Sequence, residues 1–155
     1  MNQEHPLYPR LEALAWQKSK PFCYLCYGAA PTGRCVRCGS DDLMRLVDGV
    51  GCEYGIEWVI EHLVEANLTP VDIDKAFEDS MVDCYPETVK IGWIEVDTIW
   101  AIQQLDSISW DVAKLEWAAN EEQDDRLVTF DNGTTYYWMD DVESFLDEQE
   151  TPPTA

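Results

Sequence analysis

Four of the six cysteines are spaced as ligands of one metal ion. Two residues separate Cys23 from Cys26, two residues separate Cys35 from Cys38, and eight residues link the pairs. A two-residue separation lets both sulfurs of a pair point toward one ion, and the linker brings the second pair around to complete a tetrahedron. Since four thiolates leave no position for water, the spacing predicts a structural metal site rather than a catalytic one.

Residues 22–39 resemble a short zinc ribbon, because they contain two such cysteine pairs, each followed within two residues by a glycine. The resemblance implies that the four cysteines ligate Zn²⁺. Gly28 and Gly39 are expected to relieve the backbone where its amides turn toward the sulfurs. Rubredoxin-like iron and a dithiol redox pair are the alternatives to zinc, and disulfides are disfavoured in an intracellular chain.

The other candidate groups do not indicate an enzyme. Cys52 and Cys84 are expected to be small buried side chains. A catalytic cysteine needs a base, and the chain offers only His5 and His62. His62 lies beside glutamates spaced four apart within residues 57–65, which a solvated helix face explains better than a second metal site. No phosphate-binding loop or nucleophile motif is present, so the sequence favours a non-enzymatic protein.

The charge of the chain is strongly negative and unevenly distributed. The 155 residues include 31 acidic and 10 basic ones, a net charge of −21, and residues 51–155 hold 26 of the acidic and four of the basic residues. Such a body repels phosphate backbones and anionic lipids, which excludes direct nucleic-acid binding by it and attachment to such membranes. No apolar run of about 18 residues and no basic-apolar leader is seen, so we expect a cytoplasmic protein.

The acidic body also has the charge density of DNA. Duplex DNA carries one charge per about 1.7 Å, so the net −22 of residues 51–155 matches about 37 Å of duplex. In size and charge the body resembles the acidic DNA-mimic inhibitors of the antirestriction and anti-CRISPR type. This resemblance implies a protein that binds and inhibits a basic partner, such as a DNA-binding protein or a nuclease. The alternatives are a zinc-ribbon adaptor that contacts other proteins and a salt-adapted acidic protein of unrecognised activity.

Clustered acids and two tryptophans are the candidate partner-binding residues. The tryptophans of the chain are expected mostly in the core, except for two with acidic neighbours that are candidate surface anchors. The aromatic content also allows a homodimer. The candidate contacts are Glu121, Glu122, Asp124, Asp125, Asp140, Asp141, Trp117 and Trp138.

The elements that must position these groups indicate an α+β fold. An N-terminal four-cysteine ribbon precedes an acidic α+β domain that ends in a β-hairpin and a helix. Asn132-Gly133 suits a type I′ turn between two strand-like runs, and Val112, Leu115 and Ala119 are expected to face the core. The predicted helices are 9–18, 53–66, one starting at Thr69-Pro70, 97–105, one starting at Ser109, and 140–148, and the predicted strands are 43–47, 88–96, 126–131 and 134–139.

The changes in composition divide the chain into four parts. An N-terminal helical segment spans residues 1–20, and the zinc ribbon spans 21–48. The acidic α+β domain spans 49–150, and residues 151–155 are expected to form a flexible tail.

Overall fold

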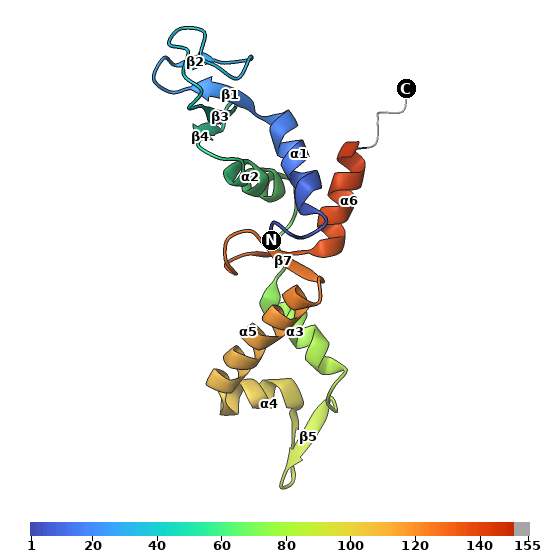
Figure 1. Ribbon diagram of the computed structural model, residues 1–155. Coiled ribbons are helices and arrows are strands. Elements are labelled where there is room, and N and C mark those ends of the chain that lie inside the picture. The colour runs from blue at the N-terminus through green and yellow to red at the C-terminus, as the bar shows by residue number, and fades with distance from the viewer. Residues whose placement is uncertain (151–155) are drawn as a thin grey trace. The chain divides into compact units, whose positions relative to one another are not determined.

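The computed structural model describes residues 1–150 and has the predicted α+β class, with six helices and small antiparallel sheets (Figure 1). The chain divides into two compact units. Unit 1 contains residues 1–69 together with the described residues from Asp140 onward, and unit 2 contains residues 70–139. The tail expected at 151–155 lies outside the described residues.

The cysteine-rich segment of unit 1 is organised by a four-stranded antiparallel sheet. Its strands lie in the order β2 (Gly28–Ala29), β1 (Lys20–Cys23), β3 (Met44–Val47) and β4 (Gly51–Glu53). The strand predicted near 43–47 is therefore β3. The strands have only two to four residues and few buried side chains, so the sheet has little apolar packing to hold it together.

Three helices supply most of the buried side chains of unit 1. They are α1 (Tyr8–Lys18), α2 (Glu57–Asn67) and α6 (Met139–Glu150). Each helix buries residues three or four apart, the spacing of one helix face. The fully buried side chains are Leu11, Val59, Val64, Val142 and Leu146.

Arg45 fastens the sheet of unit 1 to the end of α1. From β3, its Nη2 donates to the backbone oxygens of Trp16 at 3.1 Å and Ser19 at 2.8 Å. Its guanidinium also lies 4.2 Å from the centre of the Trp16 ring, which adds a cation–π contact. Because the last carbonyls of a helix lack partners within the helix, an arginine is well suited to this position.

Unit 2 is built around one aromatic cluster. Phe77 and Trp110 are buried with their ring centres 4.7 Å apart, and Ile99 completes the cluster. Met81 and Trp117 pack against it while remaining half-buried. In chain order, the unit contains α3 (Ile73–Val82), β5 (Thr88–Ile91), β6 (Ile94–Asp97), α4 (Thr98–Leu105), α5 (Ser107–Gln123), β7 (Leu127–Thr129) and β8 (Tyr136–Trp138).

Two elements of unit 2 differ from the expected ones. The third helix does not start at Thr69-Pro70, because the Asp72 carboxylate caps α3 by accepting a hydrogen bond from the Lys75 N–H at 3.2 Å. The strand predicted at 88–96 is a hairpin of β5 and β6. Gly92 adopts a φ of +65°, which lets the chain reverse within a run of strand-forming residues.

The prediction for the buried face of α5 was wrong. Val112 and Leu115 are 50% and 66% exposed and Ala119 is exposed, whereas Trp110 and Ala118 are buried. Both sets recur at helical spacing, so the sequence contained two possible apolar faces. The face with the tryptophans is buried because Trp110 fits beside Phe77.

The hairpin predicted around Asn132-Gly133 is present, but its loop is longer than two residues. The last pair of the ladder is Thr129 with Tyr136. Asn132 and Gly133 do have positive φ angles, of 58° and 91°. The Asp131 side chain organises the loop by accepting hydrogen bonds from the Thr135 N–H at 2.8 Å and the Thr129 hydroxyl at 2.9 Å.

Truncation of Phe77 is expected to unfold unit 2 at lower denaturant concentration. Because this ring is 2% exposed and contacts two tryptophans, Phe77→Ala should cost roughly 3–5 kcal/mol of unfolding free energy. Leu115→Ala removes an apolar side chain from the exposed face of α5 and should change stability by about 0.5 kcal/mol or less. Urea titrations followed by tryptophan fluorescence would measure both, and equal effects would contradict the assigned core.

The Asp131 loop should make stability depend on acid. Burial alone would raise the pKa of Asp131. Hydrogen bonds from Thr135 and Thr129 lower the pKa by more than burial raises it, so the pKa lies below its usual 3.8. The carboxylate therefore contributes stability above about pH 4, and this contribution is lost as the pH falls through the lower pKa of the folded state. The stability difference between the wild type and Asp131→Asn should shrink from pH 7 to pH 3 in urea titrations. A difference that stays constant would contradict this role.

Candidate metal centre

The four cysteines come from three places in the ribbon segment. Cys23 is the last residue of β1, and Cys26 lies in the turn that leads to β2. Cys35 and Cys38 lie in the loop between β2 and β3. The pairing of Cys23 with Gly28 across β1 and β2 fixes the first turn relative to the sheet. Short sequence separations and one strand pair are therefore enough to gather the four thiols.

The geometry of the cluster suits a tetrahedral metal ion. The four sulfur atoms all lie within 4.8 Å of one another, and the Cys23 and Cys38 sulfurs are 3.8 Å apart. Four sulfurs placed about 2.3 Å from a central zinc ion would be separated by about 3.8 Å. All six cysteines of the chain are free thiols, so no disulfide competes for the ligands. The four cysteines predicted from spacing thus form one site that can hold a metal ion.

The backbone around the second pair turns its amides toward sulfur. The Arg37 N–H donates to the Cys35 sulfur at 3.4 Å, and the Gly39 N–H donates to the Cys35 carbonyl at 2.9 Å. Gly39 has a φ of +71°, as its expected role requires. Gly28 does not have this conformation, and Tyr27 adopts the positive φ of 52° in its place. The expectation for Gly28 was therefore wrong by one residue.

The electrostatics of the cluster favour a bound cation. Hydrogen bonds from the Cys38 and Arg37 backbone amides lower the pKa of Cys35 to about 6. Hydrogen bonding with the Cys38 and Cys35 side chains, together with burial, raises the pKa of Cys26 to about 12. A thiolate thus forms readily at Cys35, while Cys26 resists a second negative charge. A divalent ion removes that conflict because each thiolate then binds the ion.

The site is buried toward the sheet and open on its outer side. Cys23 and Cys35 are 1% and 4% exposed, whereas Cys38 is exposed. The residues between the paired cysteines also point outward, as Leu25 and Val36 are 85% and 74% exposed. The cluster therefore joins the cysteine loops on their buried side, and the tips of these loops remain exposed to solvent.

The remaining cysteines lie apart from this cluster. Cys52 is half-buried in β4, and Cys84 is exposed, with its thiol donating to the Ser80 carbonyl at 3.4 Å. The expectation that both are buried was wrong, since Cys84 follows the end of α3 where no element covers it. Within residues 1–150, the four-cysteine group is the single cluster with metal-ligating geometry, and the glutamates near His62 do not form another.

The candidate partner-binding acids are divided between the two units. In unit 2, Glu121 and Glu122 are half-buried near the end of α5, while Asp124 and Asp125 are exposed after it. Arg126 forms ion pairs with Glu121 at 2.8 Å and Asp124 at 3.1 Å, which offsets part of this negative charge. The remaining acids of the set, Asp140 and Asp141, are exposed in the first turn of α6 and belong to unit 1.

The tryptophans are distributed differently from the expectation that most lie in the core. Trp110 is buried, and Trp117 is half-buried against Phe77, with its ring centre 5.9 Å away. Trp138 is 38% exposed, while Trp93, which the sequence placed within a strand, is 93% exposed. Gly92 was the feature of the sequence that could have predicted this exposure of Trp93, because a glycine within a strand-like run can mark a turn.

Comparisons with protein-family models, curated proteins and solved structures find no match for this chain. Among the described residues, no helix has the length and apolar character needed to cross a membrane. The metal-site assignment therefore depends on the geometry of the four cysteines.

Purified protein is expected to contain one metal ion per chain, bound by the four cysteines. Cys35→Ser should reduce the metal content to nearly zero and lower the melting temperature, because three thiolates bind less tightly and the short strands have few buried side chains. The matched control is Cys84→Ser, which changes an exposed thiol outside the cluster. Metal content measured by elemental analysis should stay at one ion per chain in the control. Unchanged metal content in Cys35→Ser would contradict the ligand assignment.

Proposed function

We propose that this chain is a non-enzymatic binding protein whose acidic surface occupies and blocks the nucleic-acid site of a basic protein. The observation that carries the proposal is the exposure of its carboxylates. The chain has 31 acidic residues, and none of them is among the buried polar residues, which are Ser19, Thr98 and Thr129. A surface with this density of negative charge attracts basic proteins and repels nucleic acid.

The negative charge is present on both units. Unit 2 has 16 acidic and four basic residues, a net charge of −12, and the remaining −9 of the chain belongs to unit 1. Basic residues also pair with acids of their own unit, as Arg10 does with Asp147 at 2.7 Å and Lys20 with Asp48 at 2.8 Å. Acidic residues outnumber basic ones in each unit, which supports a basic protein as the ligand.

The end of α5 brings four acids close together in sequence, and Asp124 and Asp125 among them are exposed. Glu121, Glu122, Asp124 and Asp125 are close in sequence at the C-terminus of a 17-residue helix. The helix dipole adds partial negative charge at this end. Basic DNA-binding sites are built to accept closely spaced negative charges, so we place the mimicry of phosphates here.

The metal in this proposal is zinc, and its role is structural. Four sulfurs that all lie within 4.8 Å of one another, with those of Cys23 and Cys38 3.8 Å apart, suit tetrahedral Zn²⁺ and would leave no open coordination position. Zinc would then stabilise a sheet whose strands have two to four residues. No catalytic step is assigned to the ion.

A second candidate function is a protein-interaction adaptor built on the ribbon. The observation that favours it is the exposure of apolar side chains at the tips of the cysteine loops. Tyr24, Leu25, Tyr27 and Val36 are 51%, 85%, 75% and 74% exposed. Exposed apolar groups on a rigid metal-bound loop form a usable contact surface, and a partner bound there would be insensitive to salt.

Charge reversal at the end of α5 is expected to weaken binding to basic proteins. The probe is the heparin-binding fraction of a host lysate, applied to immobilised protein and eluted with a salt gradient. Bound DNA-binding proteins should elute at moderate salt and should be displaced by duplex DNA. Changing Glu121, Glu122, Asp124 and Asp125 to Lys together should reduce their retention at least about tenfold.

The matched control reverses the same number of charges elsewhere. Glu4, Glu12, Asp41 and Asp42 changed to Lys give the same net charge but leave the end of α5 intact. Equal losses in both variants would indicate a diffuse charge effect and contradict the assigned surface. A partner that stays bound at high salt would favour the adaptor function. Unfolding of the wild type in dilute buffer would favour a salt-adapted protein.

A further inference from the structure

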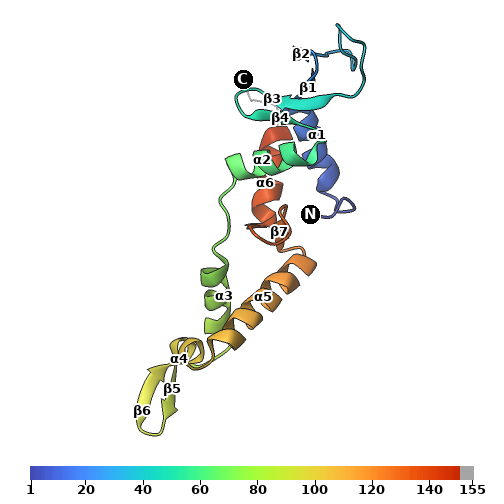
Figure 2. The same cartoon turned by 90° about the vertical axis from the view of Figure 1, so that its left-hand side faces the viewer.

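The β5–β6 hairpin ends in an almost fully exposed tryptophan. Trp93 lies in the turn after Gly92 and is 93% exposed, and Ile91 and Ile94 on either side are each 54% exposed. Figure 2 shows the hairpin projecting beyond α4, away from α3 and α5 of the same unit. Four register pairs hold its strands together, so this apolar tip is presented by an ordered element.

Apolar exposure continues on the neighbouring helices of unit 2. Trp100 and Leu105 on α4 are 54% and 76% exposed, and Ile108 at the start of α5 is 77% exposed. Single exposed apolar residues are ordinary, but several on adjoining elements indicate an interaction surface.

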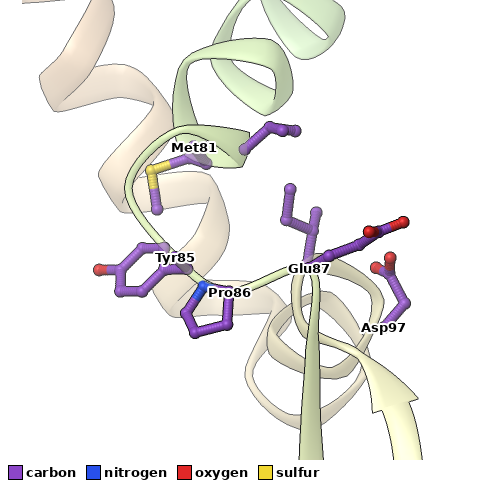
Figure 3. Close-up of a pocket in the computed structure, with 7 residues that line it drawn as sticks. Met81, Tyr85, Pro86, Glu87 and Asp97 are labelled. Carbon is purple, nitrogen blue, oxygen red and sulfur yellow. The ribbon is translucent and has the colours of Figure 1, made fainter.

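A small pocket lies at the base of the same hairpin (Figure 3). Met81, Tyr85 and Ile99 supply apolar walls, while Glu87 and Asp97 place two carboxylates at one side. Asp97 accepts a hydrogen bond from the Trp100 N–H at 2.8 Å, which fixes its side chain as the cap of α4. An apolar wall beside carboxylates suits a lysine or arginine, whose stem is apolar and whose end is cationic.

The negative charge of unit 2 indicates which kind of partner could bind the hairpin and its pocket. A second copy of this chain would bring another unit with a net charge of −12 against the first, which opposes association. An anionic lipid surface is repelled for the same reason. A basic protein with an apolar cleft satisfies both the tryptophan tip and the two carboxylates.

We propose that the β5–β6 hairpin anchors the chain to its partner. Trp93 enters an apolar cleft of a basic protein, and the pocket beside Glu87 and Asp97 receives a lysine or arginine from the rim of that cleft. This inference rests on the proposed function and adds an apolar anchor to the acidic surface. Buried tryptophans dominate the binding energy of many interfaces, whereas exposed charges contribute mainly to the rate of association.

The test measures binding with the full chain and a defined probe. Immobilised wild type is exposed to the heparin-binding fraction of a host lysate, and the retained basic protein is identified and purified. Its affinity for Trp93→Ala should fall at least about 30-fold relative to the wild type. Trp93→Phe should recover most of the loss, and Glu87→Lys should weaken binding about tenfold by repelling the incoming cation.

Tyr54→Ala is the matched control for removal of an exposed aromatic ring. Tyr54 is 53% exposed and belongs to unit 1, so its loss should change the affinity by less than about threefold. Circular dichroism melts would confirm that all variants remain folded. A photoreactive benzoylphenylalanine at position 93 should crosslink to a partner peptide that contains apolar residues flanked by lysine or arginine.

The outcomes separate failure of this inference from failure of the proposed function. Retention of a basic protein that Trp93→Ala binds as well as the wild type overturns the hairpin anchor and leaves the acidic surface in place. Absence of any basic partner overturns both. Crosslinks from position 93 to a second copy of the chain, or burial of Trp93 in phosphatidylcholine vesicles detected by its fluorescence, would assign the hairpin to dimerisation or membrane contact instead.

Discussion

The excess of carboxylates over cations is the constraint on which the rest of the structure depends. With 31 acidic and 10 basic residues, most negative charges have no cation to pair with, and an unpaired carboxylate cannot be buried at acceptable cost. The acids therefore keep at least partial contact with water, and none of them is among the buried polar residues. Each compact unit contains apolar side chains that are buried from water.

In unit 1, the four-cysteine cluster and the hydrogen bonds of Arg45 supplement apolar packing. Its sheet has short strands, and the four-cysteine cluster and Arg45 connect these strands to one another and to α1. A metal ion bound by four thiolates supplies stabilisation that does not depend on apolar area. The same cluster leaves the tips of the cysteine loops exposed, so it would both stabilise these loops and keep their tips accessible to solvent.

Unit 2 uses its aromatic residues for two different purposes. Phe77 and Trp110 form a compact cluster that holds α3 and α5 together. Trp93 and Trp100 lie on the outside of the same unit, close in sequence to Glu95 and Asp97. In the proposed function, the carboxylates would attract a basic partner at long range, and the exposed rings would slow its dissociation through short-range contact.

The sequence by itself determined the features that depend on neighbouring residues. The cysteine spacing identified the four thiols that the fold gathers into one cluster able to hold a metal ion. The helix predicted over 97–105 was identifiable because its cap, Asp97, accepts from an amide only three residues away. Tertiary structure decided which of two apolar faces of α5 is buried, because both have helical spacing and only contact with Phe77 distinguishes them. It also decided that Trp93 is exposed, since a strand-like composition does not reveal that Gly92 reverses the chain. Metal ligands and helix caps depend on residues close in sequence, so their spacing reveals them. Burial of a side chain depends on which other elements pack against it, so it requires the tertiary structure.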